Sequence, residues 1–376
     1  MLPSEPRAAD GPDERYMRLA LRLGARGLGQ TWPNPAVGCV IVNAGRIVGR
    51  GWTQPGGRPH AEVHALAHAG PAAFDATVYV TLEPCAHYGR TAPCTQALLR
   101  AGVHRVVLGA RDPDPRVDGK GIKQLRQARV QVLTGTLEAE CEAAHAGFFL
   151  RVREGRPLVT LKLATSLDAR IATASGDSQW ITNARAREVG HGLRASHDAI
   201  AVGSNTVLAD DPSLTCRLPG MAGRSPVAVV FDSRARLPLS SRLVSHVEDR
   251  PVWLLCTDRA SAERQAALSA AGVEILSVPP DDQDRVDVGA ALKALGERGL
   301  TRLLVEGGGA LAAALLGADR VDRIEAFTAP MVLGGDAKPA IGALQLGELA
   351  QARRFVPEQR ASLQTDGWVT YIRAPR

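Results

Sequence analysis

Residues 81–94 of the chain read TLEPCAHYGRTAPC, and the tripeptide His60-Ala61-Glu62 precedes them. Zinc favours nitrogen and thiolate ligands in tetrahedral geometry, and a catalytic site uses three protein ligands and leaves the fourth position to water. His60, Cys85 and Cys94 supply three such ligands. Glu62 follows the histidine closely, so its carboxylate is placed beside the metal, where it can shuttle protons. The pattern predicts a catalytic zinc centre.

The spacing of the two cysteines departs from the common pattern. Cys85 and Cys94 enclose eight residues, whereas zinc nucleobase deaminases as a class have a C-x-x-C spacing. The longer loop brings His87 and Arg90 beside the metal, and Arg90 can hold a phosphate with two parallel hydrogen bonds. We expect each zinc ligand at or near a helix start, where the helix dipole stabilises thiolate.

Two other interpretations of these residues stay open. His64 and His68 follow His60 at intervals of four residues, so a helix could carry a histidine-rich metal face. Cys85 and Cys94 alone could form a structural zinc pair. The histidine, the glutamate and the two cysteines occur in order, each beside an expected helix boundary. This order favours the catalytic site over both alternatives.

Composition excludes several classes of protein. The chain has 376 residues, of which 45% are hydrophobic and 22% charged, so it is globular and long enough for two or three domains. The longest apolar candidate, residues 308–317, is too short to span a membrane, and the N-terminal stretch lacks the apolar core of a signal peptide. We expect a cytoplasmic protein that does not bind membranes, with a loose tail of ~12 residues.

Cysteine content and charge add two constraints. Six cysteines are too few for a disulfide scaffold, so Cys39, Cys141, Cys216 and Cys256 are expected to be small buried hydrophobes. The net charge is +6, and residues 1–153 hold 19 basic and 13 acidic side chains, so they carry the whole excess. A basic domain suits an anionic ligand such as a phosphate ester or a nucleic acid, but a solvated basic surface has the same composition.

Hydrophobic periodicity divides the chain into two α/β series. In the first, Met17, Leu21 and Leu28 are expected on one face of a helix over 14–28. The other elements expected there are strands at 37–42, 47–52, 78–82, 106–108 and 130–133, and helices near 60 and at 95–101, 121–128 and 137–146. The stretch 148–157 (FFLRVREGRP) ends the pattern and is expected to be the connection, so we expect domains at 1–153 and 154–376.

The second series is also α/β. Strands are expected at 158–163, 199–202, 227–231, 252–256, 273–278, 303–305, 324–328 and 368–372, helices at 183–194, 262–271, 288–297 and 310–316, and polar loops at 165–170, 175–182 and 202–217. Gly307-Gly308-Gly309 follows a strand and precedes a helix, so its amides can approach a phosphate. Gly307, Gly309 and Ala312 also fit a Rossmann G-x-G-x-x-A pattern, and a tight turn without a ligand is a third interpretation.

The stretch PNPAVGCVIV (residues 33–42), together with the HAE tripeptide and the 81–94 run, resembles the deaminase half of the bifunctional riboflavin-biosynthesis deaminase–reductases. The resemblance implies a cytidine-deaminase-like three-layer α/β/α domain that binds one Zn²⁺ per chain at the three ligands above, with Glu62 as the proton shuttle. Positions associated with substrate binding in this family match Asn34, His87 and Arg90. The long cysteine loop distinguishes the family from cytidine and tRNA deaminases.

The polar loops of the second half resemble the reductase half of the same family, which is similar in fold to dihydrofolate reductase and uses NADPH. Ala169 stands where relatives often have glycine. The resemblance implies NADPH contacts from Ala164, Trp180, Thr206, Asp210, Ser233, Gly308, Gly309, Ala310, Leu311, Ala312, Ala313 and Ala314. It implies contacts with a ribosyl-phosphate substrate from Ser178, Arg194, Leu214, Arg217 and Glu306, with Lys162 as a further candidate. The two arginines suit a phosphate because guanidinium offers a planar fork of donors, although each alone could form a surface salt bridge.

The resemblance therefore implies a bifunctional enzyme of riboflavin synthesis. Its first domain would deaminate 2,5-diamino-6-ribosylamino-4(3H)-pyrimidinone 5′-phosphate with water activated by zinc. Its second domain would reduce the ribosyl group with NADPH to give 5-amino-6-ribitylaminouracil 5′-phosphate. The expected partner is this small phosphorylated pyrimidine and not a nucleic acid, and a homo-oligomer is compatible with the sequence.

Two rival functions stay open on the sequence alone. One is deamination of tRNA or another nucleic acid, with the basic first domain as the binding face. An aromatic content of 4% and the lack of Lys/Arg runs weigh against it. The other is a non-catalytic binding module stabilised by zinc, against which the position of Glu62 beside three ligands argues.

Overall fold

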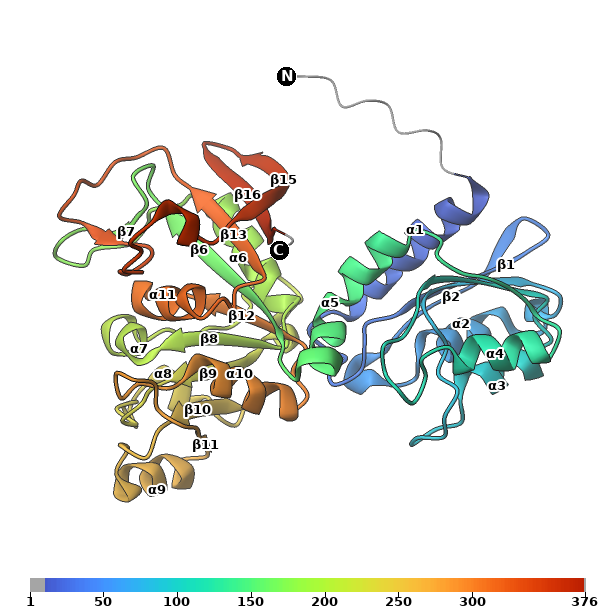
Figure 1. The fold of residues 1–376 in the computed structure, drawn as a ribbon, viewed down its shortest axis with the longest axis horizontal. Coiled ribbons are helices and arrows are strands. Elements are labelled where there is room, and N and C mark those ends of the chain that lie inside the picture. Colours follow the sequence, from blue (N-terminus) through green and yellow to red (C-terminus); the bar gives the residue numbers. More distant parts are fainter. Residues whose placement is uncertain (1–10, 375–376) are drawn as a thin grey trace. The chain divides into compact units, whose positions relative to one another are not determined.

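The computed structural model describes residues 11–374, so most of the expected loose tail lies outside the described residues. The chain forms two compact units, Met1–Glu154 and Gly155–Arg376, each built around its own β-sheet (Figure 1). We refer to them as the first unit and the second unit. Among residues 11–374, no helix combines the length and the hydrophobicity that a membrane span requires.

The first unit is a five-stranded sheet between two layers of helices. The strands lie in the order β2-β1-β3-β4-β5; β1 is antiparallel to β2 and β3, whereas β3, β4 and β5 are parallel. The strands are β1 (Gly38–Asn43), β2 (Arg46–Trp52), β3 (Thr77–Leu82), β4 (Arg105–Ala110) and β5 (Gln131–Leu133). The helices are α1 (Pro12–Gly24), α2 (Ala61–Ala69), α3 (Cys94–Arg100), α4 (Lys120–Gln127) and α5 (Glu138–Glu154), with short 3₁₀ turns at Ala25–Gly27, Pro55–Gly57 and Gly70–Ala73.

Two glycines let helices approach this sheet closely. A Cβ on Gly38 in β1 would lie 1.8 Å from the carbonyl oxygen of Ala20 in α1. A Cβ on Gly51 in β2 would lie 2.2 Å from the carbonyl oxygen of Ala61, the first residue of α2. Since any side chain there would clash with helix backbone, glycine is required at both positions. The second contact fixes the start of α2 and thus the position of its neighbour, His60.

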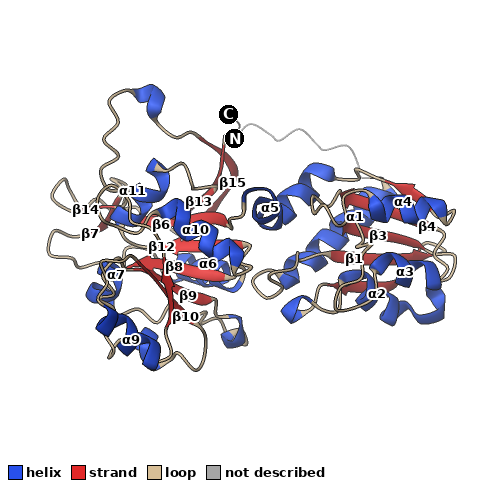
Figure 2. Cartoon of the chain, turned by 60° about the horizontal axis from the view of Figure 1, so that its bottom comes forward, coloured by secondary structure: helices blue, strands red, loops and turns tan. Residues whose placement is uncertain are grey.

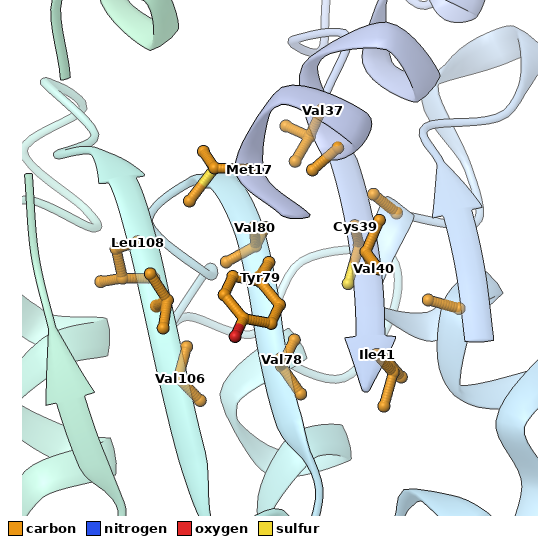
Figure 3. Close-up of a cluster of buried hydrophobic side chains, with 14 of the residues drawn as sticks. Met17, Val37, Cys39, Val40, Ile41, Val78, Tyr79, Val80, Val106 and Leu108 are labelled. Carbon is orange, nitrogen blue, oxygen red and sulfur yellow. The ribbon is translucent and has the colours of Figure 1, made fainter. Parts of the chain in front are cut away.

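Both faces of the sheet are covered by apolar side chains. Cys39, Val40 and Ile41 of β1 are each 0% exposed, so successive residues of one strand fill the cores on opposite faces. Met17 of α1 packs into one of these cores (Figure 3). This double burial explains why β1 is a continuous apolar run instead of an alternating one.

Two expectations for the first unit are wrong. Leu28 lies beyond the end of α1, whereas Leu21 lies in α1 as expected and packs, partly buried, against the core that contains Met17. The buried residues of α1 are Tyr16, Met17, Ala20, Leu23 and Gly24. The stretch from Phe148 to Glu154 is not a connection but the last part of α5, because Phe148 and Phe149 are buried in the core of the first unit.

The second unit contains a nine-stranded sheet in the order β11-β10-β9-β8-β12-β6-β13-β16-β15. Its strands are β6 (Leu158–Thr165), β8 (Ala199–Gly203), β9 (Val227–Phe231), β10 (Val252–Cys256), β11 (Glu274–Ser277), β12 (Arg302–Glu306), β13 (Arg323–Thr328), β15 (Phe355–Leu363) and β16 (Asp366–Arg373). All neighbours from β11 to β13 are parallel, and β16 and β15 add an antiparallel hairpin at one edge. A small second sheet pairs β7 (Arg170–Ala172) with β14 (Lys338–Pro339).

Helices lie on both faces of the long sheet (Figure 2). They are α6 (Ala184–Ala195), α7 (Ser204–Asp210), α8 (Arg242–Ser245), α9 (Ala262–Ala270), α10 (Val288–Glu297) and α11 (Gly309–Gly317), with 3₁₀ turns at Ala222–Arg224 and Leu349–Gln351. Because β8, β9, β12 and β6 are parallel, their carboxyl ends meet at one edge, where open α/β sheets bind ligands.

The expected fold class, two α/β domains, is confirmed. One expectation for the second unit is wrong, since the stretch 202–217 is not a continuous loop but contains α7. The glycine run at Gly307 follows β12, far from the first strand of the unit, which excludes the Rossmann interpretation. The elements that sequence reasoning did not find are α7, α8, β7, β14 and β15.

Candidate active sites

The structure brings His60, Cys85 and Cys94 together, with their ligand atoms all within 4.8 Å of one another. The Nδ1 atom of His60 lies 3.3 Å from the sulfur of Cys94 and 3.7 Å from that of Cys85. His60 is the N-cap residue of α2, and Cys94 is the first residue of α3. Cys85, contrary to expectation, lies in the loop after β3 and not at a helix start. Its sulfur nevertheless accepts a 3.3 Å hydrogen bond from the Cys94 backbone N–H, in the first turn of α3.

The chemistry of this cluster fits zinc. Hydrogen bonds from the Cys94 side chain and from His60 outweigh the effect of burial and lower the pKa of the Cys85 thiol to about 4. A thiolate, a second sulfur and an imidazole nitrogen are donors that zinc prefers, and three protein ligands leave one position for water. The residues present therefore fit a catalytic zinc ion.

Glu62 lies beside the cluster without belonging to it. It stands in the first turn of α2, is 4% exposed, and is not one of the three grouped ligands. Burial raises the pKa of its carboxyl above the ordinary value of 4.5. A carboxyl whose pKa moves towards neutrality both accepts and donates protons effectively, so Glu62 has the properties of a general acid–base group.

A cavity of about 430 Å³ is lined by His60 and Cys85 of this cluster and by Glu62. Asn34, His87 and Arg90, the substrate-binding positions implied by the resemblance, all line it. The Asn34 amide donates a 2.9 Å hydrogen bond to the Gly57 carbonyl. The Nδ1 atom of His87 is buried without a hydrogen-bond partner among residues 11–374, so it is available to a ligand.

Sequence reasoning missed six charged residues of the same cavity: Arg58, Glu83, Asp112, Asp114, Arg116 and Arg151. Arg116 forms an ion pair with Asp114, and Arg58 donates a 2.6 Å hydrogen bond to the Thr91 hydroxyl. Burial raises the pKa of Asp112 to about 7. The run RDPDPR at 111–116 was the one local signal, since charges clustered directly after a buried strand are unusual for a simple turn.

The histidine-rich metal face is not formed. His64 hydrogen-bonds through Nδ1 to the Gln54 amide at 3.0 Å, and its ring lies against Trp52 and His68 at 5.0 and 4.9 Å. Within the described ranges, the group of His60 and the two cysteines is the sole set of three candidate ligands in mutual contact.

A second cavity, of about 370 Å³, lies at the carboxyl ends of β8, β9 and β12. Five of the positions implied for NADPH line it: Thr206, Ser233, Gly308, Ala310 and Leu311. Gly308 is the N-cap of α11 with φ +82°, and a Cβ there would lie 3.2 Å from the Thr206 hydroxyl. Three basic residues also line the cavity: Arg234, Arg236 and Arg285.

The other implied cofactor positions are not among the residues that line this cavity: Ala164, Trp180, Asp210, Gly309, Ala312, Ala313 and Ala314. Trp180 is 61% exposed in the loop between β7 and α6, with the Arg187 guanidinium 4.5 Å from its ring centre. Gly309 faces backbone, since a Cβ there would lie 2.9 Å from the Pro339 carbonyl oxygen.

Three of the implied substrate residues form one charged cluster. Arg194 donates two hydrogen bonds, of 2.8 and 2.9 Å, to the two oxygens of Glu306, and the Lys162 ammonium lies 3.6 Å from the same carboxylate. Burial alone would raise the pKa of Glu306, but these two cations lower it to about 2. Arg194 is thus engaged in an ion pair, whereas Arg217 is exposed. Ser178 and Leu214 lie in loops outside this cluster.

Two family models match the chain, one for each unit. Residues 11–110 match the cytidine and deoxycytidylate deaminase zinc-binding region, and residues 157–364 match the RibD C-terminal domain. The second match covers more than half of the chain.

Proteins similar over nearly the whole length include the riboflavin biosynthesis protein RibD of Escherichia coli K12, 44% identical over 91% of this chain and 94% of the relative. RibD of Bacillus amyloliquefaciens is 40% identical over 92% of this chain and 91% of its own. Among solved structures, Acinetobacter baumannii RibD is 37% identical with a TM-score of 0.86, covering 96% of this chain and 99% of that one. A Thermotoga maritima diaminohydroxyphosphoribosylaminopyrimidine deaminase/5-amino-6-(5-phosphoribosylamino)uracil reductase is 32% identical with a TM-score of 0.83 and the same coverage.

Proposed function

Because the chain belongs to the RibD family of bifunctional riboflavin-biosynthesis enzymes, we propose that the first-unit cavity is its deaminase site and the second-unit cavity binds the NADPH of its reductase. The chain is an enzyme with both activities, and zinc and NADPH are their cofactors. The relatives do not favour a tRNA deaminase.

The substrate of the deaminase is 2,5-diamino-6-ribosylamino-4(3H)-pyrimidinone 5′-phosphate. The assignment of deaminase activity to this site rests on one observation: His60, Cys85 and Cys94 lie together beside the buried Glu62. The cavity suits a phosphate ester, because Arg58, Arg90 and Arg151 bring guanidinium groups to its lining. His87 offers a buried ring nitrogen to the same ligand.

The three ligands would hold zinc, which supplies a Lewis acid that makes water acidic near neutral pH. Glu62 accepts the proton of the attacking water and passes protons to the ring nitrogen and to the departing ammonia. Its burial keeps bulk water from competing for these transfers. His87 and Asn34 orient the pyrimidine, and Arg90 holds the phosphate.

When bound in the second unit, NADPH would supply a hydride for reduction of the ribosyl group to the ribityl group. The amides at the start of α11, beside Gly308, bind the cofactor pyrophosphate. Ser233 and Arg234 lie in the same cavity, where a guanidinium suits the 2′-phosphate. The family resemblance assigns substrate binding to the cluster of Lys162, Arg194 and Glu306, and to Ser178, Leu214 and Arg217 in the loops.

The partner is this small phosphorylated pyrimidine, and neither a nucleic acid nor a membrane. We infer a cytoplasmic location, and a homo-oligomer is compatible with this function. Mass photometry on the purified chain, with and without a 20-nucleotide RNA, tests both statements on assembly and on nucleic acid. A stable RNA complex would contradict the proposal.

The experiment that tests the two activities measures metal content, ammonia release and NADPH oxidation on one preparation supplied with the diaminopyrimidine substrate. We expect zinc in a 1:1 ratio. Removal of zinc with a chelator should abolish ammonia release, whereas oxidation of NADPH by the separately supplied deaminated substrate should continue. Ammonia release that survives complete zinc removal would contradict the assignment of the first site.

A further inference from the structure

The segment 213–217 of the second unit has no regular secondary structure but is held in one conformation. Leu214 is 3% exposed and has φ +51°, a left-handed backbone that a branched side chain rarely adopts. Such a conformation persists only where its surroundings determine it, and it is enriched at ligand-binding positions. Two residues of this segment, Leu214 and Arg217, are proposed substrate contacts.

A buried arginine holds the strained part of the segment. The guanidinium of Arg250, which is 7% exposed, donates 3.1 Å hydrogen bonds from Nη1 to the carbonyls of Leu214 and Pro226. Its Nη2 donates to the carbonyl of Ser213. Two of the three acceptors are therefore the carbonyls on either side of the Leu214 backbone dihedrals, which Arg250 fixes directly.

Other side chains hold the rest of the segment, up to and including Arg217, through hydrogen bonds to its backbone. Arg194 donates a 2.9 Å hydrogen bond to the carbonyl of Thr215, while its other donors hold Glu306. The backbone N–H of Cys216 donates to the Ser225 hydroxyl at 3.1 Å, and that of Arg217 donates to Nδ1 of His191 at 3.3 Å. Every residue from 213 to 217 thus forms a backbone hydrogen bond with a side chain outside the segment.

The charge of Arg250 is not balanced by the protein. Among residues 11–374, no carboxylate forms an ion pair with Arg250, and its three acceptors are neutral carbonyls. Burial, together with the nearby charge of Arg194, lowers the pKa of Arg250 to about 10, so the guanidinium remains cationic at neutral pH. A buried cation without a counter-charge is unfavourable, and an anionic ligand bound nearby would offset part of that cost.

We propose that Arg250 is a positioning residue of the reductase substrate site, which fixes segment 213–217 so that Arg217 meets the ligand and which adds a buried positive charge favouring a phosphorylated one. The inference rests on the proposed function, in which Leu214 and Arg217 contact the ribosyl-phosphate substrate. Arg250 donates its hydrogen bonds to backbone carbonyls, two of them in segment 213–217, so it acts through the segment.

The test compares Arg250→Lys and Arg250→Met in the full chain with Arg156→Lys as a matched control. Arg156 is also a buried arginine of the second unit, at 5% exposure, but its guanidinium is paired with Asp322 at 2.7 and 3.0 Å. We expect both Arg250 variants to raise the KM for the deaminated ribosyl-phosphate substrate by about 10-fold or more, because a small misplacement of a binding group has effects of this size. The NADPH KM and the deaminase activity should stay within about 2-fold of wild type.

Two features separate positioning from a merely structural role. Arg250→Lys keeps the charge and Arg250→Met loses it, so the methionine variant should have the higher KM for the phosphorylated substrate. For the dephosphorylated substrate, the two variants should have equal KM values. Arg156→Lys should lower the melting temperature without changing any KM. A folded Arg250→Lys protein with the wild-type substrate KM would overturn the inference.

Two arms keep the outcome interpretable. Arg217→Ala should raise the substrate KM. If it does not, the proposed substrate site is wrong. If Arg217→Ala raises the KM but Arg250→Lys does not, the site stands and only the role of Arg250 is refuted. If Arg250→Lys folds poorly, Leu214→Gly supplies a background in which the left-handed backbone is free of strain. In that background Arg250→Lys must still raise the KM relative to Leu214→Gly alone, and equal values would overturn the inference.

Discussion

Glu62 and the zinc ligand His60 are close in sequence, but they have different chemical environments. The imidazole Nδ1 of His60 faces the two sulfurs, whereas the Glu62 carboxyl is buried beside them and outside the ligand group. The N-cap position of His60 at the start of α2 produces this difference, since the histidine precedes the helix and the glutamate lies within its first turn. One helix start thus supplies a metal ligand and a proton carrier.

We predict that Glu62→Gln retains zinc and loses deamination. Glutamine preserves the shape of the side chain but cannot carry a proton, so the rate should fall by at least about 10²-fold, the usual contribution of general acid–base catalysis. Reduction of supplied deaminated substrate should be unaffected, because the reductase residues lie in the other unit. Metal analysis and the two separate assays measure these quantities.

The matched control for this prediction is Glu142→Gln, which makes the same change at an exposed position of α5. It should leave both activities unchanged. A zinc-loaded Glu62→Gln enzyme that deaminates at the wild-type rate would refute the assignment of Glu62.

A second residue-scale prediction concerns Arg90. Its side chain is exposed at the cavity and belongs to the loop between the two cysteines. Arg90→Ala should raise the KM of the deaminase step by roughly 10- to 100-fold, since a hydrogen bond to a charged group contributes about 1.5–3 kcal/mol. Zinc content should not change. An unaltered KM would show that other cavity arginines, such as Arg58 or Arg151, bind the phosphate instead.

The residues that sequence reasoning identified in this site share one property. The zinc ligands, Glu62, His87 and Arg90 belong to two short motifs with a defined chemistry, and Asn34 belongs to the PNPAVGCVIV stretch. Asp112 and Arg116 reach the same cavity from the loop after β4, and Arg151 reaches it from α5. Their proximity depends on how the strands are ordered in the sheet, which no local motif encodes.

At the scale of elements, the turn between β12 and α11 is the feature with the clearest functional consequence. Gly307 and Gly308 both have positive φ, of +76° and +82°, so the chain enters α11 in a conformation suited to glycine. The amide end of α11 then borders the second-unit cavity, at the edge where the parallel strands end. The turn therefore leaves the backbone N–H groups at the start of α11 free to donate hydrogen bonds to a ligand.

We predict that Gly308→Val raises the NADPH KM by roughly 10-fold or more. A left-handed conformation costs a residue with a Cβ on the order of 1–2 kcal/mol, and the new Cβ would also meet the Thr206 hydroxyl at 3.2 Å. Zinc content and deamination should remain normal, because the change lies in the second unit. Steady-state kinetics with NADPH and NADH measure the effect and its dependence on the 2′-phosphate.

Gly317→Ala is the matched control for the turn. Gly317 ends the same helix, and a Cβ there would meet no atom within 4 Å. This variant should keep the wild-type NADPH KM. If Gly308→Val also keeps it, the turn has only a structural role and the cofactor binds elsewhere.

Helices and strands with a buried apolar pattern were predictable, whereas elements with polar sequences were not. The stretch 204–210 contains Asn205, Thr206 and Asp210, which favour loops, yet it forms α7 through burial of Ser204 and Val207. Five consecutive residues of β15, from Val356 to Arg360, are exposed, so no alternating pattern was visible there. Tertiary pairing with β16 determines this strand.

On the scale of the whole molecule, charge and chemistry are divided between the units. The basic excess lies in residues 1–153, and four arginines line the first-unit cavity: Arg58, Arg90, Arg116 and Arg151. Arg116 is paired with Asp114, a carboxylate of the same cavity. The composition of the first half is therefore explained in part by a site for an anionic substrate.

The last prediction concerns the independence of the two units. Each unit has its own sheet, and three hydrophobic clusters each lie within one unit, one in the first and two in the second. A fragment of residues 1–154 should therefore fold, bind zinc and release ammonia without NADPH, and residues 155–376 should reduce deaminated substrate without zinc. The boundary follows from α5, which continues to Glu154.

The decisive comparison is between fragments 1–154 and 1–147. The shorter fragment ends close to where the sequence pattern places the end of this helix, and it lacks Phe148 and Phe149, which are 9% and 4% exposed in the core. Loss of one buried phenylalanine costs about 3–5 kcal/mol, and small domains have only about 5–15 kcal/mol of stability. Fragment 1–147 should therefore be unfolded or aggregated while 1–154 is active. If both are equally stable, the end of α5 contributes nothing to the first unit; if both fail while the full chain is stable, the two units depend on each other for folding.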